Sequence, residues 1–141
     1  MRNFYITLVI CIHSTFIHAQ KNIPSLVLNA FNKQYIGATE IEWEKENEHT
    51  YEVTFIFKGA DYSVNYDDTG NWLETEVDII YSELPEKVRL TIEANENIKY
   101  IQEIARIETA KGDIYFEVDF KNTLLPLKEK YYSTLGVELK K

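Results

Sequence analysis

Apolar and polar residues alternate along three stretches in the first half of the chain, at 51–57, 62–66 and 73–77. Successive side chains of a β-strand point to opposite faces, so this period of two predicts strands with one buried and one wet face. Ile41 and Trp43 predict a strand before them. The segments 58–61 and 67–70 contain the glycine and aspartate residues of tight turns. The pattern therefore predicts a four-stranded antiparallel meander.

Apolar residues with helical spacing precede these strands. Val27, Ala30, Phe31 and Tyr35 fall on one face of a helix. Pro24 stands in the first turn, where proline is tolerated because its missing N–H would have no partner there. The first half of the chain is therefore predicted to be a helix that covers the apolar face of its sheet, an α+β arrangement.

The second half repeats the motifs of the first half. The segment 23–27 (IPSLV) is echoed by 84–88 (LPEKV), and YEVTF at 51–55 is echoed by FEVDF at 116–120. Tyr66, Gly70 and Leu73 correspond in the same way to Tyr132, Gly136 and Leu139. We predict two tandem units, 20–81 and 82–141, each a helix packed on a four-stranded antiparallel meander. Together they would form one compact domain whose two sheets could be continuous.

Within the second unit, Ser82 is the expected cap of a helix that contains Pro85, Val88 and Ile92. The alternation at 114–120 predicts a strand. The segment 124–127 predicts a weaker strand, and Pro126 places it at the edge of the sheet because proline cannot donate a ladder hydrogen bond.

Residues 1–19 have the layout of a secretory signal peptide. Arg2 precedes the apolar run 4–17, and small Ala19 precedes Gln20, so cleavage is expected after Ala19. A run of 14 residues is shorter than the roughly 20 that a membrane-spanning helix needs. The mature protein is therefore expected in the periplasm or outside the cell, with no membrane anchor.

Cleavage would limit the chemistry that is available to the mature chain. Cys11, His13 and His18 would leave with the signal, and His49 would be the only remaining thiol or imidazole. Zinc, thiol and Ser-His-Asp chemistry lose their usual groups, so no catalytic residue, metal site or cofactor is predicted. Loss of Arg2 would change the formal net charge from −8 to −9, which disfavours nucleic acid and anionic lipid as partners.

The acidic stretch 65–76 raises a different possibility. Asn65, Asp67, Thr69, Gly70 and Glu76 match the positions of an EF-hand calcium loop. An EF-hand needs helices on both sides, whereas the flanking residues alternate with the period of strands. We therefore predict a β-hairpin, and keep a cation or small-ligand protein that uses the acidic 67–76 turn as the alternative function.

Glu74 and Glu76 would project from one strand face about 7 Å apart, a separation that acid–base catalysts use. Carboxylates that alternate along an exposed strand usually form a solvated face, and the sequence indicates no enclosed pocket to raise one pKa. We therefore predict that the protein is not an enzyme.

The polar face of the predicted sheet is the candidate binding surface. The alternation places Trp72 on this face, where it would be an anchor for a partner unless a loop or the other unit covers it. The predicted partner-binding residues are Glu52, Ile56, Trp72, Glu74 and Glu76, continued in the second unit by Tyr115 and Glu117.

These motifs together resemble one family. "P..V..AF...Y" at 24–35, YEVTF, YDDTGNWLETE at 66–76 and "LP..V" at 84–88 look like the PepSY-like, beta-lactamase-inhibitor-like family of exported bacterial proteins. The second unit departs from the pattern, with Ser133-Thr134-Leu135-Gly136 in place of an acidic turn.

The resemblance implies a fold like that of the beta-lactamase inhibitor protein, whose paired units form a continuous sheet that grips a partner. It also implies a protein or peptide as partner, such as a secreted peptidase or another exported enzyme. We therefore expect an exported, non-enzymatic module that binds a protein or peptide on its open sheet face and could act as an inhibitor.

Overall fold

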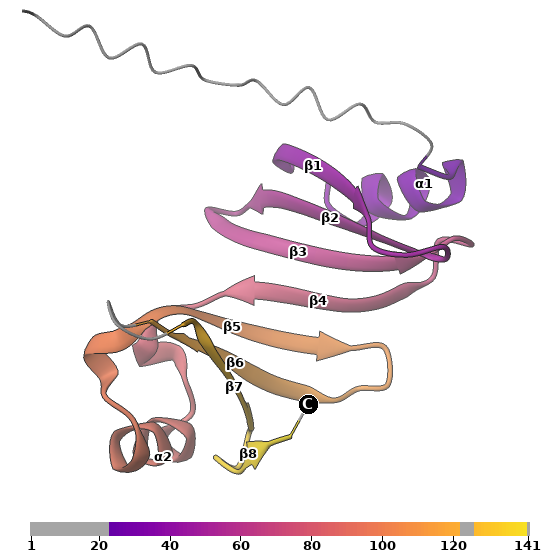
Figure 1. Cartoon of the computed structure of the whole chain (residues 1–141). Coiled ribbons are helices and arrows are strands. Elements are labelled where there is room, and N and C mark those ends of the chain that lie inside the picture. The colour runs from indigo at the N-terminus through magenta and orange to yellow at the C-terminus, as the bar shows by residue number, and fades with distance from the viewer. Residues whose placement is uncertain (1–22, 122–125, 141) are drawn as a thin grey trace, which may run out of the picture.

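A computed structural model describes residues 23–121 and 126–140 (Figure 1). The predicted signal peptide and its cleavage site lie outside the described residues. The first half contains α1 (Ser25–Gln34), β1 (Thr39–Lys45), β2 (Thr50–Phe57), β3 (Ala60–Asp67) and β4 (Trp72–Asp78). The second half contains η1 (Tyr81–Glu83), α2 (Glu86–Asn95), η2 (Ile98–Tyr100), β5 (Ile101–Thr109), β6 (Ile114–Phe120), β7 (Lys128–Ser133) and β8 (Glu138–Leu139). Among the described residues, no helix has the length and apolar character needed to cross a membrane.

The strands form one eight-stranded antiparallel sheet in the order β1 to β8, so each strand pairs with its neighbour in the chain. Pairing of β4 with β5 joins the two halves, with Glu76 opposite Ile107 and Val77 opposite Arg106. This register keeps the same face of the sheet toward α1 in the first half and toward α2 in the second half. The predicted α+β class and the predicted continuous sheet are confirmed.

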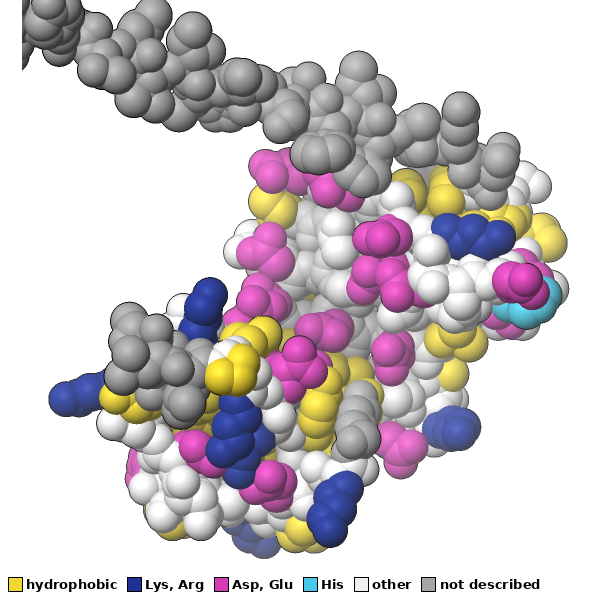
Figure 2. All heavy atoms as spheres, viewed as in Figure 1, with side chains coloured by type: hydrophobic (Ala, Val, Ile, Leu, Met, Phe, Trp, Pro, Cys, Tyr) yellow, Lys and Arg dark blue, Asp and Glu magenta, His cyan; other side chains and the backbone are white. Residues whose placement is uncertain are grey.

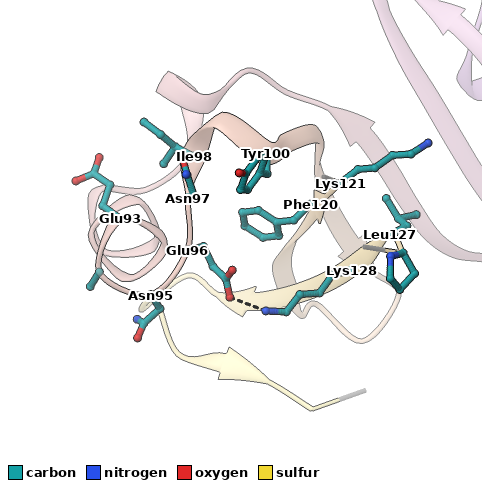
Figure 3. A pocket seen from close by; sticks show the side chains of 12 residues that line it. Glu93, Asn95, Glu96, Asn97, Ile98, Tyr100, Phe120, Lys121, Leu127 and Lys128 are labelled. Atoms are coloured by element: carbon teal, nitrogen blue, oxygen red, sulfur yellow. Dashed lines mark hydrogen bonds and ion pairs between the residues drawn. The ribbon is translucent and has the colours of Figure 1, made fainter. Parts of the chain in front are cut away.

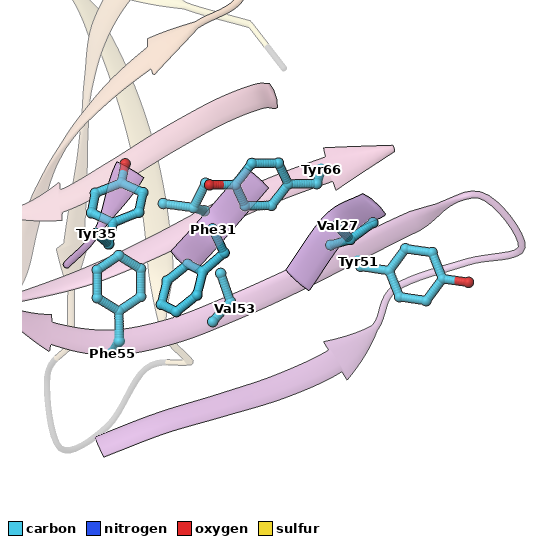
Figure 4. Packing of buried hydrophobic residues seen from close by; sticks show 8 residues of the cluster. Val27, Phe31, Tyr35, Tyr51, Val53, Phe55 and Tyr66 are labelled. Carbon is cyan, nitrogen blue, oxygen red and sulfur yellow. The ribbon is translucent and has the colours of Figure 1, made fainter. Parts of the chain in front are cut away.

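Two separate apolar clusters lie between the helices and the sheet. In the first, Val27 and Phe31 of α1 pack on Val53, Phe55 and Val64 of the sheet (Figure 4). Aromatic rings dominate this cluster, and the ring centroids of Phe31 and Phe55 lie 4.9 Å apart in an edge-to-face arrangement. The second cluster is made by the following residues: Leu84, Val88, Ile92, Ile104, Phe116, Val118, Phe120 and Tyr132. Val53, Phe55 and Val64 face inward as predicted in the first half, and Phe116, Val118 and Phe120 do so in the second half. Leu73 and Ile114, also predicted to face inward, belong to neither cluster, and Ile114 is exposed.

The helix starts differ from the prediction in one respect. Pro24 and Pro85 occupy the N-cap positions of α1 and α2, and neither helix has a side-chain cap. Ser82, the predicted cap, lies instead in the 3-10 helix η1. The carboxylate of Glu83 accepts a hydrogen bond from the backbone N–H of Ile80 at 2.9 Å, which holds this short turn before α2 begins.

The edge of the second half also differs from the prediction. Pro126 and Leu127 are exposed and not in a strand, and β7 starts at Lys128. The remainder of the predicted 124–127 strand falls outside the described residues. Pro126 lacks an N–H group, so the ladder with β6 begins only after it, where Lys128 pairs with Phe120.

Candidate functional site

The face of the sheet opposite the two helices, called the open face below, is the candidate site. Strand pairing places on it a set of mostly acidic side chains together with a smaller apolar set. The acidic members are Glu42, Glu44, Glu52, Asp61, Glu74, Glu76, Asp78, Glu103, Glu117, Asp119 and Glu129. The paired strand residues described on this face include no lysine or arginine. Figure 2 shows acidic side chains gathered over the strands, with apolar side chains between them.

A single row across the sheet shows how strand register assembles this surface. Thr54 lies opposite Ser63, Ser63 opposite Glu76, Glu76 opposite Ile107, and Ile107 opposite Tyr115. Glu76 therefore stands at the centre of the row, where β4 of the first half meets β5 of the second half. Residues that are far apart in the chain become neighbours only through this pairing.

The carboxylates of the open face repel one another. Partial burial, and then the charges of Glu117, Asp78, Glu103 and Glu52, raise the pKa of Glu76 to about 7. Burial, followed by the charges of Glu103 and Asp61, raises the pKa of Asp78 to about 6. Ionisation of the central acids is therefore costly unless a positive charge comes close to them.

A hollow of about 410 Å³ opens on this face where β1 to β5 come together. Six acidic residues contribute to its lining: Glu40, Glu42, Asp61, Glu76, Asp78 and Glu103. Thr54, Ile56 and Ser63 also line it. Carboxylates are the most numerous polar groups in this hollow, and as hydrogen-bond acceptors they suit a donor-rich cationic group.

A group of apolar side chains lies among the acids in the second half of the open face. Ala105, Ile107 and Tyr115 are buried, with 2%, 3% and 8% of their surface exposed, although they belong to neither helix-covered cluster. The ring centroids of Tyr115 and Tyr131 lie 6.2 Å apart in an edge-to-face arrangement. The open face thus combines a charged region with an apolar strip.

Six of the seven predicted partner-binding residues lie on the open face. These are Glu52, Ile56, Glu74, Glu76, Tyr115 and Glu117. Their placement follows from the alternation that predicted it. Whether they bind a partner remains a prediction.

The predicted orientation of Trp72 is wrong. The register shifts between Asn65 and Tyr66, so Trp72 pairs with Tyr66 and packs against the first apolar cluster on the helix side. Its indole N–H donates a hydrogen bond to the Thr75 hydroxyl at 2.8 Å. The irregularity inserts an extra residue into β4 and reverses the face of the side chain before it. Trp43, predicted to be a core residue, does pack against this cluster.

The acidic stretch forms the predicted hairpin, with strands β3 and β4 on either side of the turn. The Asp67 carboxylate accepts hydrogen bonds from both the backbone N–H and the side chain of Thr69 and of Asn71. These bonds lower the pKa of Asp67 to about 2. The Asp68 carboxylate is hydrogen-bonded to Nδ1 of the His49 ring at 2.8 Å. The turn therefore uses its own carboxylates to hold its shape.

Two groups of three carboxylates among the described residues bring one oxygen each within 4.8 Å of one another. They are Glu44, Glu46 and Glu52, and Glu117, Asp119 and Glu129. Neither group contains Asp67, Asp68 or Glu76, on which the alternative cation-binding function relied. The hairpin geometry gives that alternative no support.

Sequence reasoning missed several residues that line the acidic hollow, among them Glu42, Asp78 and Glu103. Asp78 continues the period of two from Glu74 and Glu76, so that signal was available in the sequence. Glu103 follows a register shift between Ile101 and Glu103, which interrupts the alternation along β5. Its position beside Asp78 depends on strand pairing that no local pattern reports.

A second cavity, of about 850 Å³, lies beside the end of α2 (Figure 3). Tyr100, Phe120 and Leu127 form its apolar wall, and Glu96 is paired with Lys128 at 2.8 Å on its polar side. At the corresponding end of α1, Tyr35 packs on Phe55 with ring centroids 4.6 Å apart. The cavity lies on the helix side of the sheet and is separate from the open face.

Comparison with known proteins agrees with this architecture. A protein of Bacteroides eggerthii described as "putative periplasmic" has a TM-score of 0.77 at 19% identity, over 84% of this chain and 87% of that chain. A DUF2874 family protein of Bacteroides ovatus has a TM-score of 0.73 at 19% identity, over 84% and 86%. A BLIP-like protein of Bacteroides fragilis has a TM-score of 0.66 at 24% identity, over 83% and 84%. At identities this low, the structural matches establish likeness of fold alone.

A search of curated proteins gave no match. The family model described as "Putative beta-lactamase-inhibitor-like, PepSY-like" matches residues 10–56 and 49–139, which together span both helices and nearly the whole sheet. The chain therefore belongs to the PepSY-like family.

Proposed function

We propose that the protein is an exported, non-enzymatic module that binds a basic segment of a protein or peptide on its open face. The observation that carries this proposal is the set of acids spread over the open face, unaccompanied by any lysine or arginine among the described strand residues of that face. Glu52, Glu74, Glu76 and Glu117 would contact the basic groups. Ile56 and Tyr115 would contact apolar parts of the partner.

Electrostatics supports a cationic partner. A lysine or arginine that enters the acidic hollow would offset the burial and the like charges that together raise the pKa of Glu76 and of Asp78. Complementary charge also speeds association and rejects partners of the wrong sign. Contact with the partly exposed Ile56 would add burial of apolar surface, which supplies affinity that charge pairs in water do not.

The proposal includes the organisation of the chain. Residues 1–19 would be a signal peptide removed after Ala19, and 20–81 and 82–141 would be two copies of one unit. The order of one helix followed by four strands in each half supports this duplication. The mature protein would act in the periplasm or outside the cell, where a secreted peptidase or another exported enzyme would be an accessible partner to inhibit.

Binding of short probe peptides to residues 20–141 tests this proposal. A labelled lysine-rich peptide is expected to bind more tightly than an arginine-free, glutamate-rich peptide of equal length, and more weakly as salt is added. The double variant Glu76→Gln and Glu117→Gln should raise the Kd of the lysine-rich peptide by about tenfold.

The control is the double variant Glu86→Gln and Glu93→Gln, which removes the same charge from the exposed side of α2. It should leave the Kd within about twofold of the wild-type value, because a distant exposed charge is screened by salt. Equal effects of the two double variants would contradict an open-face site, and equal binding of both peptides would contradict a basic partner.

A further inference from the structure

Among the described strands, β1 lies at the edge of the sheet and has β2 as its single neighbour. The backbone N–H of Glu46 donates to the Thr50 carbonyl at 3.1 Å, and Glu44 and Glu42 follow at steps of two opposite Glu52 and Thr54. In an antiparallel ladder, alternate residues direct their N–H and C=O groups to the same side. Glu42 and Glu44 therefore bond toward β2, and the backbone groups of Trp43 and Lys45 point to the outer edge.

The side chains of this edge are sorted by face. Glu42 and Glu44 lie on the open face, where Glu44, Glu46 and Glu52 come within 4.8 Å of one another. Trp43 lies on the helix side, half-buried, with its ring centroid 5.4 Å from that of Phe31. A strand added at this edge would place alternate side chains beside Glu42 and Glu44 on the open face. Its other side chains would lie beside the indole of Trp43 on the helix side.

These features disfavour a second copy of this chain as the occupant. Antiparallel pairing of two β1 strands would place the acids of one copy against those of the other, and like charges opposite each other destabilise a sheet. The register shift between Thr39 and Glu42, with Glu40 at a φ of 53°, also ends the regular edge at Glu42. The usable edge is short, from Glu42 to Lys45.

We propose that the β1 edge binds a short extended segment in which lysine or arginine alternates with apolar residues, added antiparallel to β1. Its basic side chains pair with Glu42 and Glu44 on the open face, and its apolar side chains pack beside Trp43. Backbone hydrogen bonds to Trp43 and Lys45 hold it, as in other cases of strand addition at a sheet edge. This inference rests on the proposed function for the basic character of the partner, and specifies how that partner docks.

The test uses the labelled peptide acetyl-Lys-Val-Lys-Val-Lys-amide and two analogues of it that carry N-methyl groups on different backbone nitrogens. In antiparallel addition, the two valines lie opposite the outward-bonding residues Trp43 and Lys45 and therefore donate to β1. N-methylation of the valines should weaken binding by about tenfold or more, because these hydrogen bonds are lost. N-methylation of the inner lysine, whose N–H points away from β1, should leave the Kd within about twofold.

Two variants of the protein give an independent readout. Lys45→Pro removes an outward N–H and should weaken binding by about tenfold, whereas Lys45→Gln keeps the N–H and should bind as tightly as the wild type or more tightly. Both variants lose the same positive charge and the same contact of Lys45 with the Tyr51 ring. A difference between them therefore reports on the backbone bond. The N-methyl pair keeps the test valid if Lys45→Pro fails to fold.

Equal binding of the two N-methylated analogues would overturn the inference. If the double variant Glu76→Gln and Glu117→Gln still bound the peptide more weakly than the wild type in that case, the proposed function would stand without strand addition. If neither the N-methyl groups on the peptide nor the Glu76 and Glu117 substitutions altered binding, both proposals would be wrong. A concentration-dependent dimer that Lys45→Pro abolishes would identify a second copy as the occupant and would also overturn the inference.

Discussion

Glu76 illustrates how one residue acquires properties from its place in the sheet. It lies opposite Ser63 on one side and Ile107 on the other, so its carboxyl is partly buried between the two halves. Partial burial, and then the acids around it, raise its pKa to about 7 from the ordinary value of 4.5. The folded state therefore holds this proton more tightly than the unfolded state does. As pH rises from about 4.5 to about 7, ionisation of Glu76 destabilises the fold.

We predict that Glu76→Gln stabilises the protein at pH 8 and has no effect at pH 4.5, where the wild-type carboxyl is already protonated in the folded state. The gain at pH 8 should be on the order of 1 kcal/mol, less than the full pKa shift implies because water screens the partly exposed carboxyl. Urea unfolding at both pH values measures the difference. Glu86→Gln, on exposed α2, is the matched control. A gain that is equal at both pH values would contradict this assignment.

At the scale of elements, the same contact recurs in both halves between a turn and a helix. The turn after β3 contains Gly70 at a φ of +83°, and a Cβ there would lie 2.7 Å from the Leu26 carbonyl oxygen of α1. The turn after β7 contains Gly136 at a φ of +77°, and a Cβ there would overlap the Lys87 carbonyl oxygen of α2. Only glycine combines this backbone conformation with so close an approach.

Alanine substitutions should separate these two requirements. Gly59 has a φ of +85° with nothing within 4 Å of its Cβ position, so Gly59→Ala should cost about 1–2 kcal/mol from the backbone conformation alone. Gly70→Ala and Gly136→Ala should each cost roughly 1–3 kcal/mol more, because helix and turn must move apart. Chemical denaturation of the three variants gives the comparison. Equal losses at all three glycines would mean that the close approach has no energetic role.

At the scale of the whole molecule, one sheet joins two cores. α1 and α2 cover different parts of the same face, and their apolar clusters share no residue. The direct strand connection between the halves is the β4–β5 ladder, which extends from Glu74 to Asp78. The open face is continuous across this ladder, so a partner that covers it would contact both halves at once.

Two valines test how independent the cores are. Val64 and Val118 are both fully buried, one in each cluster. Each change to alanine should cost roughly 2–3 kcal/mol of unfolding free energy. The double variant should cost the sum to within about 0.5 kcal/mol, because the two sites share no packing neighbours. A deviation above about 1 kcal/mol in urea unfolding would indicate coupling of the cores through the sheet.

The alternation of apolar and polar residues was sufficient to predict most of the strands, the α+β class and the inward face of Val53 and Val64. The chemistry of Asp67 and Gly70 was sufficient to predict the hairpin. These features are local, because side-chain direction in a strand and the preferences of a tight turn follow from neighbouring residues alone. The family resemblance was likewise legible in motifs of a few residues.

Register was decided only in the tertiary structure. The irregularity at Asn65 and Tyr66 turned Trp72 toward the helix, against the period of two that predicted the opposite. Pairing of β4 with β5 brought Glu76 beside Ile107, and packing of the strands placed Glu103 close enough to raise the pKa of Asp78. Such choices depend on the energy of contacts between residues distant in the chain, which no local pattern in the sequence contains.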